Sequence, residues 1–394
     1  MAAVRLMQRS RPGVSRQVMS DSWQEGPANR WAFQHVTEIL PCAVISRGEG
    51  PVLPLVADHR DLARLRLRGI PGRPTLRTFL RTSSTDGLLV LRDGGVVFEQ
   101  YLNGMQPTTR HLLQSVSKSL CGALTGELVG DGLVDLDAVA SAYVPELSGS
   151  AFGDATVTQL LDMTASIEFT EEYADPGSDV QTQDRAAGWR PRQAGDPGNS
   201  YQFLRSLRQK GAHGRVFQYC SATTDALAWV LERATGSRYA DLLADVVWSR
   251  IGAEHDAFIT VDTAGFALAN GGISVSLRDL ARFGHLMLRG GSSGAHQAFR
   301  PEWVAGTRAG AGPDLMRGTD FAALYPEGSY RANWWLTGND RGTFLATGIY
   351  GQYLWIDPST NLVIAKLSSL PAALDPAVRV AHHRAFAAIA ESLD

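Results

Sequence analysis

Two residues spaced for chemistry lie in the first third of the chain. Ser115 and Lys118 form a Ser-x-x-Lys pattern within residues 111–129, HLLQSVSKSLCGALTGELV. Positions three apart lie on one face of a helix, so the hydroxyl and the amine can touch if this segment is helical. A lysine kept neutral by desolvation can take the serine proton and make the oxygen a nucleophile. The pattern therefore suggests nucleophilic catalysis by a serine with an amine as its base.

The segment around this pair favours a helix. Apolar residues recur at every fourth position from Val116 to Leu128, which predicts a stripe buried against a core. Gly122 and Gly126 predict close packing on several sides, because a glycine in a loosely packed helix costs roughly 1 kcal/mol relative to alanine. Ser-x-x-Lys is common by chance, so the hypothesis depends on this apolar setting and on suitable partners elsewhere in the chain.

Two further stretches could supply such partners. Tyr219, in RVFQYCSA, precedes a predicted helix, and its phenol either moves a proton near the Ser-Lys pair or packs in the core. The stretch Gly348-Ile349-Tyr350-Gly351 ends a predicted strand. Its glycines would let a substrate approach the backbone, and a backbone N–H there could stabilise an oxyanion.

Other patterns carry less weight. Residues 290–294 match Gly-x-Ser-x-Gly but follow a helical pattern instead of a strand, so we expect a loop. The nine histidines show no His-Glu-x-x-His spacing, His382 and His383 are expected on the surface of the last helix, and no metal site is expected. Trp189, in a polar stretch, and Trp335, on a strand, are pocket candidates, with burial in the core as the equal alternative.

The composition excludes several classes of function. The chain has 394 residues, 44% hydrophobic and 20% charged, with a formal net charge of −3, so neither nucleic acid nor a membrane surface is an expected partner. Its three cysteines show no Cys-x-x-Cys spacing, which predicts neither a disulfide framework nor a zinc site, and no dinucleotide or phosphate-loop motif implies a cofactor. Without an apolar leader or a membrane-length apolar run, a cytoplasmic location is expected.

Strand patterns lie at both ends of the chain and enclose a mostly helical stretch. We therefore expect an α/β (α+β) fold, with an antiparallel sheet built from both ends and flanked by helices, plus a mostly helical domain. Strands are expected at residues 87–92, 95–102 and in four runs between 334 and 367; helices at 201–209, 224–234, 277–288 and 372–392; and a long polar loop at 168–200.

The expected domain organisation follows from these elements. An N-terminal arm covers residues 1–22, the sheet domain covers 23–114 and 263–394, and the helical domain covers 115–262. The functional site is expected at the interface of the two domains.

The motifs also resemble a known superfamily. Ser115-x-x-Lys118, Tyr219-x-Ser221 and the Gly-rich strand end near residue 348 occur in the order seen in penicillin-recognising serine enzymes, which include class C β-lactamases, DD-peptidases and related esterases. Longer strings (SVSKSLCG, YVPEL, QTQDRAAGW, FQYCSA, SLRDLARFG) resemble the 6-aminohexanoate-dimer hydrolases from about Trp23 to the last helix. The resemblance implies a β-lactamase/DD-peptidase-like fold and a serine amidohydrolase that cleaves linear nylon oligomers through an acyl-enzyme, with carboxylesterase activity alongside.

The resemblance further implies roles for individual residues. Ser115 would be the nucleophile, Lys118 the general base and Tyr219 the residue that assists proton transfer. The backbone N–H groups of Ser115 and Ile349 would form the oxyanion hole. Asp184 matches the position that pairs with the terminal ammonium of the substrate, and the matched pocket positions are Tyr173, Trp189 and Asn270. A carboxylate about one substrate length from the serine would orient an ω-amino amide.

Departures from the superfamily pattern argue against a β-lactam substrate. The third motif has Tyr350 in place of a Lys-Thr-Gly sequence, and Ser221 stands where the lactamases have Asn. Tyr350 also replaces the His expected in the nearest family. Two alternatives stay open: a carboxylesterase or D-amino peptidase with incidental amidase activity, and a non-catalytic relative that binds a small molecule. The oligomeric state is open as well, with a homodimer as one option.

Overall fold

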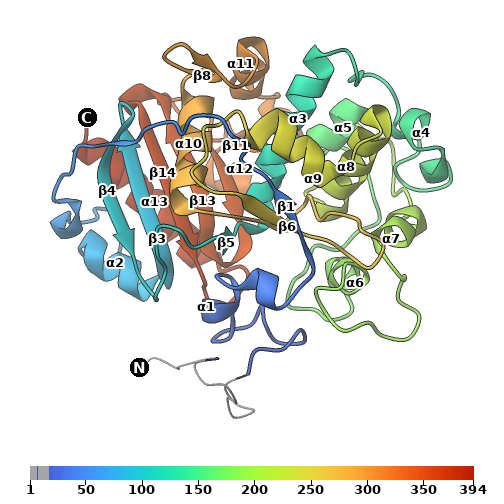
Figure 1. Ribbon diagram of the computed structural model, residues 1–394, viewed down its shortest axis with the longest axis horizontal. Helices are drawn as coiled ribbons and strands as arrows, with labels where there is room; N and C mark the ends of the chain where they lie inside the picture. The colour runs from blue at the N-terminus through green and yellow to red at the C-terminus, as the bar shows by residue number, and fades with distance from the viewer. Residues whose placement is uncertain (1–6, 8–16) are drawn as a thin grey trace.

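The computed structural model describes Met7 and residues 17–394 (Figure 1). Most of the arm predicted at residues 1–22 therefore lies outside the described residues. Trp23 is 1% exposed, and its indole N–H donates to the carbonyl oxygen of Trp189 at 2.7 Å. Trp23 thus anchors this part of the chain to the body of the protein.

The largest sheet has eight strands and draws on both ends of the chain. Its order is β10 (Ser329–Arg331), β11 (Trp334–Leu336), β12 (Phe344–Gly348), β13 (Gln352–Asp357), β14 (Leu362–Ser368), β3 (Thr85–Arg92), β4 (Gly95–Tyr101) and β2 (Val56–Ala57). β14 pairs antiparallel with β3, with Lys366 opposite Leu88, and so joins the C-terminal meander to the N-terminal hairpin. Only the short edge strand β2 runs parallel to its neighbour in this sheet. The predicted sheet is confirmed.

Helices cover both faces of this sheet. Successive residues of a strand point to opposite faces. On β3, Leu88 and Val90 belong to the cluster that contains Phe386 of α13 (Pro376–Ser392). Leu89 and Leu91 belong to the other cluster, which contains the apolar side of α10 (Leu277–Leu288). In Figure 1, α10 crosses the sheet near β14 and β3. Because both faces are buried, the central strands are apolar throughout instead of alternating.

The other half of the molecule is mostly helical (Figure 1). It contains α3 (Ser117–Gly130), α4 (Ala140–Tyr143), α5 (Val157–Leu161), α6 (Asp179–Ala186), α7 (Ser200–Ser206), α8 (Ser221–Thr235) and α9 (Tyr239–Leu242). The loop predicted at residues 168–200 is wrong in its middle, because α6 begins there behind Ser178, whose side chain accepts from the Gln181 backbone N–H. Within the described part of the chain, no helix is both long enough and apolar enough to cross a bilayer.

A second, four-stranded sheet was not predicted. Its order is β1 (Cys42–Ile45), β6 (Ala257–Thr260), β7 (Ile273–Val275) and β5 (His111–Leu112). Strands of two to four residues give almost no alternation to detect, and these four come from three distant parts of the chain. β6 lies inside the stretch 115–262 assigned to the helical domain, whose boundaries stay a prediction.

Two smaller predictions are corrected. His382 and His383 are 0% and 4% exposed, because α13 turns this pair onto the sheet, where His382 stacks on Tyr353. Burial lowers the pKa of His383 to about 3. Residues 290–294 are part of a hairpin of β8 (Ser292–Ser293) and β9 (His296–Gln297) instead of a free loop. The remaining helices are α1 (Asn29–Ala32), α2 (Leu76–Thr82), α11 (Pro301–Ala309) and α12 (Asp320–Leu324).

The close packing predicted for α3 is confirmed. Every residue from Ser117 to Leu128 is buried. A Cβ at Gly122 would lie 2.2 Å from the carbonyl oxygen of Ala332, and one at Gly126 would lie 2.3 Å from the ring of Trp303. The glycines therefore let the neighbouring chain touch the backbone of this helix.

We expect Gly122→Ala to lower the free energy of unfolding by about 1–3 kcal/mol, because a methyl group has no room beside Ala332. Gly306, in α11, is the matched control, since nothing lies within 4 Å of a Cβ there. Gly306→Ala should raise the free energy of unfolding by about 0.5–1 kcal/mol through helix propensity. Urea unfolding measures both variants, and effects of equal sign would contradict the packing argument.

Candidate active site

Ser115 lies where a strand turns sharply into a helix. β5 ends at Leu112, the 3₁₀ turn Gln114–Val116 follows, and α3 begins at Ser117. The helix predicted over residues 111–129 is therefore wrong at its start. Gln114 has φ of 50°, a left-handed conformation that is uncommon for a residue with a Cβ. The turn still leaves Ser115 and Lys118 one helical turn apart.

The Lys118 amine lies among three oxygen atoms. Its Nζ is 2.9 Å from Ser115 Oγ, 3.2 Å from Ser221 Oγ and 2.8 Å from the backbone oxygen of Asn270. Lys118 is 1% exposed, and the ring of Tyr219 lies over the amine with its centroid 5.1 Å away. The predicted Ser-Lys contact is therefore present in a site nearly closed to water.

A buried carboxylate fixes the Asn270 segment behind this amine. Asp225, on α8, accepts hydrogen bonds from the backbone N–H of Asn270 at 2.9 Å and from its Nδ2 at 2.6 Å. Gln183 of α6 donates to the same carboxylate at 2.7 Å. Burial raises the pKa of Asp225 to about 6, against the opposing effect of these hydrogen bonds. Asn270 thus contacts Lys118 through its carbonyl, with its side chain turned to Asp225. The sequence reasoning missed Asp225.

A cavity of about 300 Å³, here called the Ser115 cavity, opens at the pair. Ser115, Tyr173, Tyr219, Trp335 and Ile349 are among the residues that line it. The Tyr219 and Trp335 rings stack with centroids 5.5 Å apart and form an aromatic wall. The structure therefore brings five of the predicted site residues to one cavity, with Lys118 directly behind Ser115.

The end of β12 packs directly on the turn that carries Ser115. A Cβ at Gly348 would lie 2.7 Å from the carbonyl oxygen of Leu113 and 3.0 Å from the Ser115 backbone nitrogen. Only glycine allows this approach without a shift of the backbone. The backbones of Ser115 and Ile349 consequently share one wall of the cavity, which is the arrangement that a pair of oxyanion donors requires.

Glu171 is a residue of the site that sequence reasoning missed. It lines the Ser115 cavity, and its carboxylate accepts from the Ser221 hydroxyl at 2.5 Å and from the Ser221 backbone N–H at 2.8 Å. The Tyr173 hydroxyl donates to the same carboxylate at 2.5 Å. Burial and this nearby charge raise the pKa of Tyr173 well above its usual value. In the sequence, only its position two residues before the candidate Tyr173 could have pointed to Glu171.

Asp184 lies farther from the pair and already has a cationic partner. Its carboxylate accepts from Arg190 Nε at 3.3 Å and from Gln24 Nε2 at 3.2 Å. Burial raises the pKa of Asp184, and the neighbouring guanidinium of Arg190 opposes that shift. The predicted ammonium-binding carboxylate is therefore paired with a side chain of this chain.

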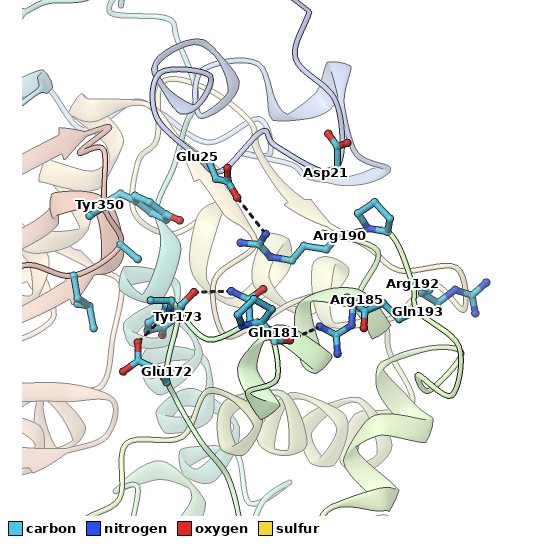
Figure 2. A pocket seen from close by; sticks show the side chains of 16 residues that line it. Asp21, Glu25, Glu172, Tyr173, Gln181, Arg185, Arg190, Arg192, Gln193 and Tyr350 are labelled. Atoms are coloured by element: carbon cyan, nitrogen blue, oxygen red, sulfur yellow. Dashed lines mark hydrogen bonds and ion pairs between the residues drawn. The ribbon is translucent and has the colours of Figure 1, made fainter.

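Arg190 itself lines a second cavity of about 590 Å³, here called the Arg190 cavity (Figure 2). In Figure 2 its guanidinium points across the cavity to Glu25, with an N···O distance of 4.0 Å. Asp184 is not among the residues that line this cavity. Both cavities share Tyr173, Ala373 and Leu374, so they adjoin, and charged side chains line the Arg190 cavity.

Trp189 packs in the core. It is 3% exposed, its indole N–H donates to Thr260 Oγ1 at 3.0 Å, and its ring meets Trp23 edge to face. It lines neither of the two cavities, so its substrate contact stays a prediction. In residue 7 and residues 17–394, no group of three or more His, Cys, Asp or Glu side chains is arranged to hold a metal ion.

Comparisons with known proteins identify the family and the fold. Residues 77–389 match the family model described as Beta-lactamase. The chain is 48% identical over 364 residues to the 6-aminohexanoate-dimer hydrolase of Paenarthrobacter ureafaciens, covering 92% of this chain and 90% of that protein.

Two solved structures share the fold. A Bacillus anthracis protein provisionally named a 6-aminohexanoate-dimer hydrolase superposes with a TM-score of 0.87 at 27% identity, over 98% of this chain and 99% of that one. EstCE1, a hydrolase with promiscuous acyltransferase activity, superposes with a TM-score of 0.61 at 15% identity, over 79% and 98%. The predicted β-lactamase-like fold is confirmed.

We expect Asp225→Asn to slow the labelling of Ser115 by a fluorophosphonate probe about tenfold at about pH 8, because the new amide group faces a backbone donor and shifts Asn270 off Lys118. The effect should shrink at about pH 5, since Asp225 protonates as the pH falls through about 6. Asp241→Asn, at a half-exposed carboxylate of α9, is the control. A loss that is the same at both pH values would contradict this account.

Proposed function

The chain belongs to the beta-lactamase family, and from that premise we propose that this serine amidohydrolase cleaves linear amides of 6-aminohexanoate oligomers, above all the dimer, through an acyl-enzyme. Carboxylesterase activity accompanies it. The observation that carries the proposal is the 2.9 Å contact between Ser115 Oγ and a Lys118 amine that is 1% exposed. The substrate class follows the curated relative, which is 48% identical over nearly its whole length.

The hydrogen bonds of Lys118 fit its proposed role as a general base. An uncharged amine has two N–H bonds and one lone pair. The Asn270 carbonyl can only accept a hydrogen bond, and Ser221 accepts from Lys118 because its own proton goes to Glu171. Both N–H bonds are then used, and the lone pair faces the Ser115 hydroxyl. Removal of the hydroxyl proton leaves the oxygen free to attack.

The reaction then proceeds in two stages. Ser115 Oγ attacks the amide carbon, and the N–H groups of Ser115 and Ile349 stabilise the oxyanion. The proton taken by Lys118 passes to the leaving nitrogen with the help of the Tyr219 hydroxyl, and the C–N bond breaks. Water attacks the resulting ester in the same way and releases the acid. Tyr173 and Trp335 line the cavity where the aliphatic chain lies.

Carboxylesterase activity on neutral esters is the second candidate for the main activity, favoured by the Asp184–Arg190 pair. A terminal ammonium can reach Asp184 only if Arg190 moves aside, since Arg190 lies on the cavity side of that carboxylate. Neutral short esters need no such movement. Comparison of kcat/KM for aminohexanoate dimer, D-amino amides and p-nitrophenyl esters separates the amidase, peptidase and esterase functions.

We expect Ser115→Ala to abolish hydrolysis while the protein keeps its fold, because the residue supplies the bond-forming oxygen. Mass spectrometry of the unaltered enzyme should detect an acyl adduct on Ser115. Lys118→Ala should reduce kcat by roughly 10²–10⁴, the usual contribution of general-base catalysis. Full hydrolysis by folded Ser115→Ala would reject the mechanism, and absence of both turnover and probe labelling would favour the non-catalytic alternative.

We expect Asp184→Asn to lower kcat/KM for the dimer by roughly 10- to 100-fold, the value of a charge-assisted hydrogen bond, and to leave neutral esters nearly unchanged. Arg190→Gln is the matched variant, since it frees Asp184 and should favour substrates with an ammonium group. Equal losses on both substrate classes would show that Asp184 has only a structural role.

A further inference from the structure

The chain uses lysine very sparingly. It has 37 basic residues, and only three of them, Lys118, Lys210 and Lys366, are lysines. Lys210 is exposed, whereas Lys118 and Lys366 are 1% and 0% exposed. Arginine stays charged in proteins, but a buried lysine can exist as a neutral amine. Two of the three lysines are therefore buried where a neutral amine can exist. The proposed reaction uses Lys118 and leaves Lys366 without a role.

Lys366 lies on β14, inside the main sheet. Its amine donates to the backbone oxygen of Gly351 at 3.4 Å and contacts Ser368 Oγ. Lys366 interacts electrostatically with Asp86 on β3 and His382 on α13, and Tyr353 lies opposite it on β13. Asp86 is held by His111 at 3.0 Å and by Ser369 at 2.7 Å.

No ion pair of Lys366 occurs among the described residues. Burial lowers the pKa of Lys366 to about 7, and the charge of Asp86 only partly opposes this. Two acceptors match the two N–H bonds of an uncharged amine, so the surroundings suit the neutral form.

The Gly351 oxygen belongs to the turn that carries the proposed oxyanion donor. In the turn Ile349–Gly351, Tyr350 has φ of 61°, a left-handed conformation that costs a residue with a Cβ roughly 1–2 kcal/mol. Each of the three carbonyls accepts a hydrogen bond: that of Ile349 from Gln352 Nε2 at 3.3 Å, that of Tyr350 from the Leu370 N–H at 3.1 Å, and that of Gly351 from Lys366. Hydrogen bonds to all three of its carbonyls therefore hold the strained turn in place.

These supports form one sealed network. Gln352 Nε2 also donates to the Ser368 carbonyl at 2.7 Å, and its Oε1 accepts from the Ser368 N–H at 3.0 Å. Gln352, Lys366 and Ser368 are each 0% exposed. Lys366 and Ser368 resemble a second Ser-Lys pair, but a substrate cannot reach them, so their effect on chemistry must act through the turn.

We propose that Lys366 is a positioning residue which, as an uncharged amine, holds the turn Ile349–Gly351 so that the Ile349 N–H faces the Ser115 cavity. This inference rests on the proposed function, because the N–H matters only if an oxyanion forms there. The expected effect is on the transition state: kcat should depend on Lys366, and KM should not.

The charge of Lys366 is measured directly by ¹³Cε-lysine NMR on the full chain, since three lysines give three signals. Lys210→Arg and Lys118→Met each remove one signal, and the remaining one belongs to Lys366. We expect that signal to titrate near pH 7, well below the usual range of a lysine. Titration near pH 10 would overturn the proposal. The NMR titration does not depend on enzymatic activity. It therefore tests the charge of Lys366 even if the proposed reaction is wrong.

The positioning role is measured by kinetics. Lys366→Met should lower kcat by about 10- to 100-fold, toward the loss of one oxyanion donor, with KM within about twofold. Lys210→Met is the control and should match the unaltered enzyme. If Lys366→Met does not fold, Ser368→Ala replaces it, since it removes one acceptor of the amine. An unchanged kcat in a folded variant, or a loss confined to KM, would overturn the positioning role.

Discussion

The contact between the Ser115 hydroxyl and the Lys118 amine is the interaction on which the rest of the structure depends. An amine can act as a base only where water and acidic partners do not stabilise its charge. α3 keeps water away from Lys118 because it is buried on every side, with Gly122 against a neighbouring backbone and Gly126 against a tryptophan ring. The dense packing of this helix is thus a source of stability and a requirement of the proposed chemistry.

The walls of the Ser115 cavity come from segments far apart in the chain. The Ser115 turn follows a strand of the small sheet, the Ile349 turn ends a strand of the large sheet, and Tyr219 precedes a helix of the other half. Gly348 lets the two turns touch, and the buried network around Lys366 fixes one of them. An oxyanion site of the kind proposed needs closely placed donors, and support at all three carbonyls of the strained turn is consistent with that need.

Carboxylates orient the hydrogen bonds around Lys118. Glu171 takes the proton of Ser221, and Asp225 fixes the Asn270 segment. Neither of them bonds directly to Lys118, whose hydrogen-bond partners are Ser115, Ser221 and the Asn270 carbonyl. Asp184, in contrast, forms an ion pair with Arg190. Under the proposed function, this difference separates the reacting groups from the region that would bind the substrate ammonium.

Local patterns alone were sufficient for the Ser-Lys pair, the helix at 277–288 and most strands of the large sheet, because helical spacing and buried strands are encoded by neighbouring residues. The resemblance carried by longer strings was sufficient for the family and for Asp184 as a site candidate.

Only the tertiary structure decided the small sheet, the hydrogen-bond partners of Glu171, Asp225 and Lys366, and the burial of His382. Each of these depends on residues brought together from distant segments. A short strand, a lone acid or a lone lysine has no local signal, because burial and hydrogen-bond partners exist only once the chain has folded.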